Sequence, residues 1–417
     1  MRDEQTEVLV VGAGPVGLLT AIVAAEAGLA VKVIDQESRT TARSYACALH
    51  PRTLNLLDEM GLAAPMLEQG RKVETVAFYD RESRRAEVKL AGLGGKFPFL
   101  LILPQSAFEH ALEQRLQKAG VTVEWGHRFA DCQDQGDAVT ATVEELGGTA
   151  TGYIVPHWET IVKNRISVRA RYVVGADGQR SLVRQRLGIE NTRVTGPEYF
   201  AAYEFESEGA SETEVKVVLD DTTTNVLWPL QGNKCRWTFQ LIKAEGLDEF
   251  PTKERRSVRF AQQTVDEDIR QHVERVARQR APWFKANVRA MTWCTDVVFE
   301  QRMAKQFGRN RCWLAGDAGH QAGPVGVQSM NVGLSEGAAL ARNLRKMLRD
   351  RAPAGVLETY DRERQQEWQQ LLGLKGGLKP RNDTDAWVSQ RRSRILPCLP
   401  ASDADLSRLA AQLRVDI

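Results

Sequence analysis

Three groups of glycine and acidic residues in this sequence have the types and spacing needed to hold a phosphate-bearing cofactor. The first is Gly12-Ala13-Gly14-Pro15-Val16-Gly17, which directly follows a short apolar run and opens a helical stretch. In such a turn Gly12 permits a tight bend, Gly14 lets the backbone approach a pyrophosphate, and Gly17 allows a helix to pack closely on a sheet. Amide groups and the helix dipole then face the anion.

An acidic residue completes this first group. Asp35, followed by Gln36, ends the next predicted strand, 18 residues after Gly17. A carboxylate there can accept hydrogen bonds from an adenosine ribose. Strand, glycine loop, helix, second strand and terminal acid together predict a dinucleotide site, whereas the loop alone would equally fit a tight turn in an ordinary α/β protein. The pattern does not distinguish FAD from NAD.

Two further groups place an aspartate at the end of a predicted strand. In residues 172–184 an apolar strand runs into Asp177-Gly178 and then a helix. In residues 312–331 a strand runs into Gly316-Asp317, then a Gly/Pro loop and a helix. This last loop and helix carry His320, Pro324, Gly326, Met330 and Asn331. An aspartate in such a place can bind a ligand at the edge of the sheet, and it can also cap the helix that follows.

The pattern along the chain places these motifs between predicted strands and helices. Residues 6–35 read as strand, turn, helix and strand, which is a parallel βαβ unit. Helical patterns follow at 51–60, 106–119, 333–349 and 356–373, and strand-rich stretches at 73–103, 138–175 and 197–245. The highly charged residues 252–280 also favour a helix, and Ser402 is the predicted cap of a short final helix.

The composition excludes several classes of protein. The 417 residues include 56 basic and 54 acidic side chains, and 42% are hydrophobic, so neither disorder nor nucleic-acid binding is indicated. No run approaches the roughly 18–20 apolar residues of a membrane span, and the N-terminus lacks a signal-peptide pattern. The six cysteines and six histidines are scattered without zinc spacing. We therefore expect reduced thiols, a cytoplasmic location and no metal site.

In the order and spacing of its three motifs, the segment 6–349 resembles the group A FAD-dependent monooxygenases, the para-hydroxybenzoate hydroxylase-like family. The resemblance implies a Rossmann-like FAD-binding domain assembled from separated segments, an inserted β-rich substrate domain with a mixed sheet, and C-terminal helices. It assigns residues 1–75, 104–190 and 296–350 to the FAD-binding domain, 76–103 and 191–295 to the substrate domain, and 351–417 to the C-terminal helices.

The resemblance also implies that FAD is held non-covalently. Asp317 would accept a hydrogen bond from a ribityl hydroxyl, and Asp177 would bridge the FAD-phosphate and pyridine-nucleotide regions. Helix N-terminal amides after the loop would stabilise negative charge at flavin N1 and O2. The predicted cofactor-binding residues are Gly12, Ala13, Gly14, Pro15, Val16, Gly17, Asp35, Gln36, Arg43, Gln105, Phe129, Asp177, Gly178, Gly316, Asp317, Pro324, Gly326, Met330 and Asn331.

One of these assignments has a named alternative, and one neighbouring residue departs from the family pattern. Arg43 matches the family's phosphate-contacting arginine, but another register puts Tyr45 in that place, and Arg43 would then be a solvated loop residue. Ser329 stands where the family usually has glycine after the Pro324 loop. Because serine tolerates fewer backbone conformations than glycine, its effect on the amides over the flavin is left open.

By resemblance, the reaction begins when NADH or NADPH reduces FAD and O2 adds to form a flavin C4a-hydroperoxide. Its distal oxygen then passes to an aromatic, phenolic or polycyclic small molecule. His320, Pro324 and Arg236 are the candidate catalytic residues. His320 alternatively ties the loop, Pro324 shapes the floor of the site, and Arg236 alternatively lies at the surface. Strand alternation and resemblance select Trp228, Pro229, Thr238 and Gln240 for substrate contact.

Other functions on the same fold stay open as alternatives. They are epoxidation, halogenation or reduction by a related flavin enzyme, and an inactive flavin-binding relative. The halogenase signature Trp-x-Trp-x-Ile-Pro is absent from the sequence. The motifs do not decide between NADH and NADPH, between monomer and homodimer, or among individual aromatic substrates.

Overall fold

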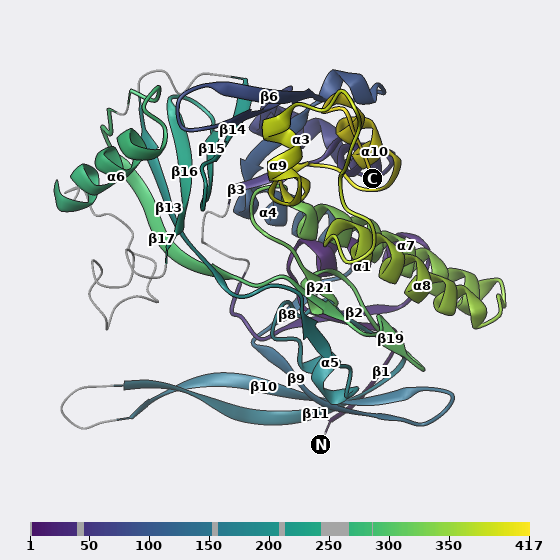
Figure 1. Cartoon of the computed structure of the whole chain (residues 1–417). Coiled ribbons are helices and arrows are strands. Elements are labelled where there is room, and N and C mark those ends of the chain that lie inside the picture. Colours follow the sequence, from purple (N-terminus) through teal and green to yellow (C-terminus); the bar gives the residue numbers. More distant parts are fainter. Residues whose placement is uncertain (1, 40–45, 152–156, 208–212, 243–266, 286) are drawn as a thin grey trace.

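The structure is a computed structural model that describes residues 2–39, 46–151, 157–207, 213–242, 267–285 and 287–417 (Figure 1). Its first sheet contains β1 (Arg2–Val11), β2 (Val31–Asp35), β8 (Val123–Trp125), β9 (His127–Asp134), β10 (Val139–Thr151), β11 (His157–Gly175), β19 (Gly308–Arg309) and β20 (Cys312–Leu314). The order is β19-β20-β11-β1-β2-β8, and β9 and β10 continue from β11. From β20 to β8 every pairing is parallel. The carboxyl ends of β1, β2, β11 and β20 therefore meet at one edge.

Helices cover the first sheet because parallel strands are apolar on both faces. They include α1 (Pro15–Glu26), α4 (Gln105–Lys118), α7 (Gln328–Arg349) and α8 (Gly355–Leu371), with α1 packed between α4 and α7. Two glycines one helical turn apart let α7 approach α1. A Cβ at Gly337 would lie 2.2 Å from the Thr20 Oγ1, and one at Gly333 would lie 2.9 Å from Val16. This close crossing places the start of α7 beside the loop that opens α1.

A second, seven-stranded sheet stands apart from the first (Figure 1). Its strands are β5 (Thr75–Tyr79), β6 (Arg84–Lys89), β13 (Glu198–Glu206), β14 (Glu214–Leu219), β15 (Thr224–Pro229), β16 (Lys234–Leu241) and β17 (Met291–Phe299), in the order β17-β13-β16-β15-β14-β5-β6. Only β14 and β5 pair in parallel. Trp237 and Phe239 bury one face against α6 (Glu267–Arg280), and Val226 and Trp228 on the other face join the main core.

Shorter elements connect the two sheets. One small sheet contains β3 (Ala46–Leu49), β4 (Arg71–Val73) and β7 (Leu100–Pro104), another contains β12 (Asn191–Arg193), β18 (Arg302–Ala304) and β21 (His320–Gln321), and a third contains β22 (Lys379–Pro380) and β23 (Val415–Asp416). The remaining helices are α2 (Pro51–Glu59), α3 (Ala63–Gln69), η1 (Leu90–Leu93), α5 (Leu182–Arg186), η2 (Gly316–Ala318), α9 (Ala386–Ile395), η3 (Leu396–Cys398) and α10 (Asp403–Gln412). The C-terminal helices pack back onto the molecule, α10 against η1 and β6.

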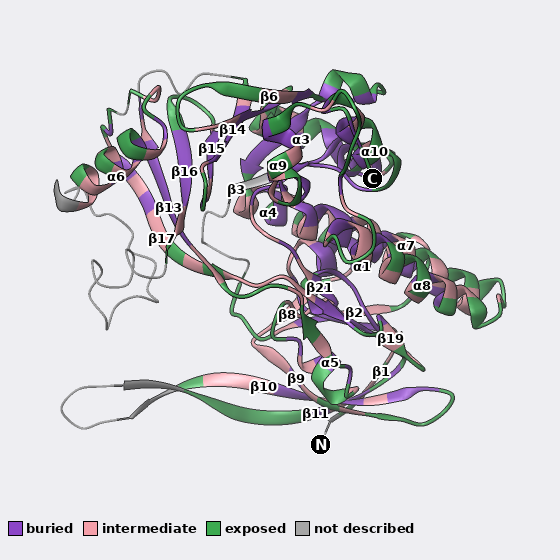
Figure 2. Ribbon diagram, viewed as in Figure 1, coloured by how far each residue is buried: buried purple, intermediate pink, exposed green. Residues whose placement is uncertain are grey.

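The burial pattern joins these parts into one body. Purple, buried segments in Figure 2 run from the centre of the first sheet through α1 and α7 to the inner strands of the second sheet. Val8, Leu9 and Val10 of β1 have no exposed surface. The far end of the β10–β11 hairpin is the exception, because it projects into solvent with Ile161 and Val162 about 40% exposed.

The mixed α/β organisation expected from the sequence is present, and one helix-cap prediction is confirmed in position but not in its side-chain bond. Ser402 is the N-cap residue of α10, but its side chain makes no capping hydrogen bond there. It instead accepts a long contact from Arg52, 3.4 Å away. The expected helix at 252–280 is described only from α6 onward, since residues 243–266 lie outside the described ranges. The domain limits stay a prediction; β5 pairs with both β14 and β6, and β17 runs past residue 295.

Candidate functional site

The loop between β1 and α1 is shaped by two glycines that no other residue could replace without movement. Gly12 has a φ of +104°, and a Cβ there would lie 2.3 Å from the Ala176 carbonyl oxygen. A Cβ at Gly17 would lie 2.0 Å from the Gly12 oxygen. Gly14 is different, because its φ is −71° and a Cβ would meet nothing within 4 Å. Gly14 therefore borders space at the start of α1 that no described residue fills, and within the same ranges no side chain caps that helix.

Asp35, at the end of β2, holds this loop in place. Its Oδ2 accepts the Ala13 N–H at 2.6 Å, and its Oδ1 accepts the Glu37 N–H at 2.8 Å. A carboxylate offers about four acceptor positions, so these bonds leave room for ligand hydroxyls. Gln36 follows it on the exposed side of the strand end.

Asp177 follows the end of β11, next to the same loop, and its two carboxylate oxygens have different surroundings. Its Oδ2 accepts the N–H groups of Leu182 and Val183 at 2.7 and 3.2 Å, so it caps the start of α5 as the sequence alternative proposed. Its Oδ1 is buried and has no hydrogen-bond partner within the described residues. Burial raises the pKa of this carboxyl. Gly178 follows in the left-handed region with a φ of +74°.

The Gly316-Asp317 turn follows β20 and faces the same edge of the sheet. Gly316 has a φ of +66°, and a Cβ there would lie 2.9 Å from Val16. Asp317 keeps an exposed face, although the protein packed around it limits its hydration and raises the pKa of its carboxyl. The three sequence motifs thus meet at one place, with Val16 and Ala176 in contact with glycines of the other motifs.

His320 is buried behind this turn and does not line any cavity described below. Its Nε2 lies 2.7 Å from the Glu336 Oε2, and its ring stacks on Trp368 with 3.6 Å between centroids. Glu336 also accepts the Gly316 N–H and the Trp368 Nε1–H, at 2.9 and 2.8 Å. Burial opposes ionisation of Glu336, but the charge and hydrogen bond of His320 outweigh it and lower the pKa of the carboxyl. This geometry supports the structural interpretation of His320, and its acid–base role stays a prediction.

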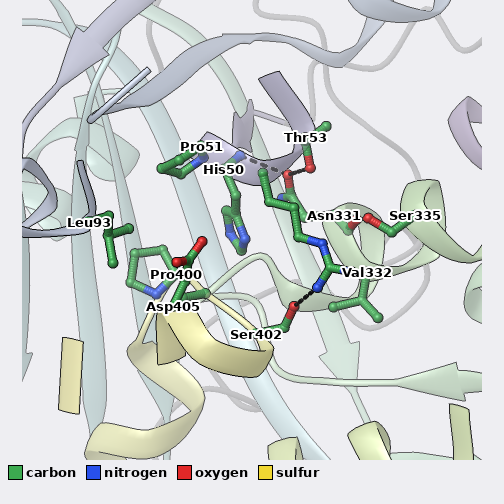
Figure 3. A pocket seen from close by; sticks show the side chains of 12 residues that line it. His50, Pro51, Thr53, Leu93, Asn331, Val332, Ser335, Pro400, Ser402 and Asp405 are labelled. Atoms are coloured by element: carbon green, nitrogen blue, oxygen red, sulfur yellow. Dashed lines mark hydrogen bonds between the residues drawn. The ribbon is translucent and has the colours of Figure 1, made fainter. Parts of the chain in front are cut away.

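Asn331 fixes the loop that leads into α7, and Figure 3 shows its contacts with His50 and Thr53. Its Oδ1 accepts the His50 N–H and the Thr53 hydroxyl at 2.8 and 2.7 Å. Its Nδ2 donates to the carbonyls of Ala48 and Val327 at 2.7 and 2.8 Å. Val327 has a φ of +50°, which strains a β-branched residue. The loop is thus held in a conformation that the chain disfavours locally.

His50 was not selected from the sequence, yet it is part of this loop's support. Its ring Nε2 lies 2.9 Å from the Gly326 carbonyl oxygen, and burial lowers the pKa of the imidazole to about 4. The signal available in the sequence was the His-Pro pair at 50–51, which begins α2. A small pocket beside it is lined by His50, Asn331 and the C-terminal residues 400–402 (Figure 3).

Ser329 lies in the first turn of α7 with ordinary helical geometry. Its Oγ accepts the Ala322 N–H at 2.8 Å, so the hydroxyl ties the two ends of the Pro324 loop together. Met330, one residue on, is half-buried on α7. Of the non-glycine residues in 316–331, Val327 has the left-handed backbone, not Ser329.

A cavity of about 490 Å³ opens between the second sheet, the Pro324 loop and the C-terminal segment. Pro324 and Gln240, both selected from the sequence, line it. The sequence missed Glu198 and Phe200 on β13 and the segments 371–378 and 392–398. The C-terminal residues carry no local motif that could have identified them.

Other predicted substrate and catalytic residues lie elsewhere on the sheet. Trp228, Pro229 and Thr238 are buried but do not line the cavity. Arg236 is buried rather than at the surface; its Nε donates to the Glu204 Oε1 at 3.0 Å, and its guanidinium lies over Trp293. Its role toward substrate stays a prediction.

Three further residues belong to the predicted cofactor-binding set. Gln105 begins α4, and its Nε2 donates to Glu109 at 2.7 Å. Phe129 is buried in β9 with Leu9 and Val11. Arg43 lies outside the described residues.

Within the described ranges, no group of three or more His, Cys, Asp and Glu side chains is arranged to hold a metal ion. No helix in that same part of the chain is both long and apolar enough to cross a membrane.

Comparison with known proteins gives a consistent picture. The family model of the FAD binding domain matches residues 5–374. 6-Methylpretetramide 4-monooxygenase of Streptomyces rimosus is 31% identical over 361 residues, which make up 86% of this chain but 59% of that protein. This chain therefore spans about three fifths of that relative's length.

Two solved structures share the fold. The p-nitrophenol 4-monooxygenase of Pseudomonas putida DLL-E4 has a TM-score of 0.74 at 21% identity, covering 99% of this chain and 95% of that chain. A ternary complex of aklavinone-11 hydroxylase with FAD and aklavinone has a TM-score of 0.66 at 24% identity, covering 88% and 66%. The fold class expected from the sequence is thereby confirmed.

Proposed function

The chain belongs to the FAD binding domain family, that of the group A flavin monooxygenases, and on that premise we propose that it hydroxylates an aromatic small molecule. The single observation that carries the proposal is the position of the Pro324 loop. That loop joins the Asp317 turn to α7 and at the same time forms a wall of the 490 Å³ cavity. A cofactor at the turn and an organic substrate in the cavity would therefore be neighbours.

The residues at the three turns fit FAD. Open space at Gly14 and the uncapped start of α1 suit a pyrophosphate, because amide groups and the helix dipole favour an anion there. The Asp177 Oδ1 is a buried acceptor that receives no hydrogen bond from any described residue. A hydroxyl group of the ligand would supply that hydrogen bond. Asp35 and Asp317 offer further acceptors for ribose and ribityl hydroxyls.

The protein's own part in the reaction is to position and shield the reactants. When bound, FAD supplies the redox chemistry and the activated oxygen. Helix α7 packs on the Gly316 turn, and the dipole of its N-terminus would favour negative charge at a flavin bound there. The hydrogen bonds of Asn331, His50 and Ser329 hold the loop that separates cofactor from cavity. Holding the reactants in fixed positions lowers the entropic part of the activation barrier and so speeds the reaction.

Several finer points belong to the same proposal. The reductant is NADH or NADPH and the oxidant is O2, as the family membership suggests. The substrate is a phenolic or polycyclic compound, because 6-methylpretetramide 4-monooxygenase and aklavinone-11 hydroxylase carry such compounds in their names. The protein is a monomer or homodimer. A cytoplasmic location suits the free thiols of Cys132, Cys235, Cys294, Cys312 and Cys398.

Anaerobic reduction of the purified yellow protein tests this proposal. NADH and NADPH are each mixed with the protein, alone and with a panel of phenols, quinolones and polycyclic phenols. We expect bleaching of the flavin absorbance, faster with one nucleotide and with some phenols. A colourless preparation that FAD does not reconstitute, or a flavin that neither nucleotide reduces under any condition, would contradict it.

A further inference from the structure

One carboxylate, Glu198, lies in the lining of the 490 Å³ cavity, and every lining residue belongs to the described part of the chain. The other ionisable groups of the lining are Arg392, Arg394 and Cys398. Burial raises the pKa of the Cys398 thiol to about 12, and guanidinium groups stay protonated in proteins. Within this lining, Glu198 is therefore the side chain available as an anionic proton acceptor.

Glu198 begins β13 and shares a sheet face with Phe200 and Gln240, which also line the cavity. The Gln240 Nε2 donates to the Glu198 Oε1 at 3.0 Å. The Gln240 Oε1 accepts the Thr224 N–H at 2.7 Å, and this bond turns the amide nitrogen toward Glu198. Within the described residues Glu198 receives no second hydrogen bond, so the carboxylate can accept one from a ligand.

The surroundings of Glu198 suit a base. Removal of water on burial raises the pKa of its carboxyl, and the hydrogen bond from Gln240 and the charge of Arg394 only partly oppose this. Arg394 itself is bound to the turn between β14 and β15, where its Nη1 donates to the Asp220 carbonyl at 2.6 Å. A carboxyl pKa moved toward the working pH makes proton transfer more effective.

The size of the cavity indicates the kind of substrate. Its volume of about 490 Å³ is roughly three times the ~150 Å³ cavity that holds one benzene ring. Pro324 and Val325 on one side and Phe200 on another provide apolar surfaces for flat rings. Two or three fused rings fit this space better than a single ring.

We propose that the Glu198 carboxylate accepts the phenolic proton of a multi-ring phenol bound in this cavity; the inference rests on the proposed aromatic hydroxylation. The phenol O–H bond breaks, its electron pair stays on the phenolic oxygen, and the proton forms a bond to a Glu198 oxygen. No oxidant or reductant is consumed in this step. The phenolate that develops is richer in electrons at its ortho and para carbons, which favours attack on an electrophilic oxygen.

Equilibrium binding to the oxidised holoenzyme, without reductant, tests the role of Glu198. The ligands are 2-hydroxyanthraquinone and its methyl ether, 2-methoxyanthraquinone, which lacks the hydroxyl proton. In the unchanged protein we expect the phenol to bind about 10- to 150-fold more tightly than the ether, since a hydrogen bond to a charged group contributes that much. In Glu198→Gln this preference should fall at least about tenfold. Glu206→Gln is the matched control, a carboxyl on the same strand but outside the lining.

A pH series adds a second readout. The preference for the phenol should decrease as the pH falls through the titration of the Glu198 carboxyl, and should be flat in Glu198→Gln. An unchanged preference in Glu198→Gln, or the same loss in Glu206→Gln, would overturn the assignment of Glu198. Failure of both ligands to bind the unchanged holoenzyme would overturn the multi-ring substrate class. Either result would leave the anaerobic flavin reduction intact, so failure of the hydroxylase proposal is recognised separately.

Discussion

Replacing Gly14 by alanine should separate cofactor binding from folding. The backbone at Gly14 is extended, and an added Cβ meets no atom within 4 Å, so the protein itself has space for the methyl group. That space is where we place the pyrophosphate of FAD. An extra methyl group in a close contact costs about 1–3 kcal/mol, which corresponds to a loss of FAD affinity of about 5- to 150-fold.

Gly17→Ala should reduce the stability of the FAD-free protein, which Gly14→Ala should largely preserve. Its Cβ would overlap the Gly12 carbonyl oxygen at 2.0 Å, and that residue cannot move freely because its N–H is bonded to the Ile34 carbonyl. Alanine improves helix propensity by about 1 kcal/mol, but the overlap should cost more, so the FAD-free protein should lose stability. Gly14→Ala should lose at most about 1 kcal/mol of stability, as an uncapped helix start allows.

The assay combines thermal unfolding of the FAD-free protein with titration of FAD by flavin fluorescence. Gly355→Ala is the control, because its added Cβ also meets nothing within 4 Å and it lies at the start of α8, away from the three turns. It should leave the FAD affinity unchanged and should not lower stability, because alanine favours a helix more than glycine does. FAD affinity in Gly14→Ala equal to that of the unchanged protein would refute the placement of the pyrophosphate.

Three further predictions concern buried ionisable side chains. Glu336→Gln should destabilise the protein by about 3–5 kcal/mol in urea unfolding, because the buried His320 loses its charged partner; unchanged stability would contradict the coupling. His50 has a folded pKa of about 4 against 6.5 when unfolded, so the unfolded state binds more protons between these pH values. Stability should fall by up to ~3 kcal/mol as the pH drops through this window, and His50→Gln should remove that slope. Arg236→Ala should cost about 3–5 kcal/mol by leaving Glu204 without its guanidinium, and Arg236→Met with Glu204→Leu should recover most of it; a change in substrate affinity alone would argue against this pairing.

The cofactor turns could be predicted from the sequence because their signals are local. Gly12, Gly17 and Asp35 lie within one βαβ unit, and the geometry that requires them is set by neighbouring residues. Asp177 and Asp317 each follow a buried strand directly. Parallel pairing then brings the ends of those strands together, as the family resemblance implied.

The cavity could not be predicted in the same way because its lining comes from distant segments. Glu198 and Arg394 approach through tertiary packing of β13 against the C-terminal segment, and neither belongs to a motif. Alternation along β16 correctly separated Arg236, Thr238 and Gln240 from Trp237 and Phe239. Alternation could not show that Arg236 pairs with Glu204 on the neighbouring strand. Of the three polar residues, Gln240 is the one that lines the cavity.

Isotope labelling tests the proposed insertion of one atom of O2 into an aromatic substrate. The holoenzyme is supplied with NADH or NADPH, a phenol that accelerates flavin reduction, and ¹⁸O2, and the product is analysed by mass spectrometry. We expect a hydroxylated product that contains one ¹⁸O atom. A product that carries no ¹⁸O, or that forms equally well without oxygen, would contradict it.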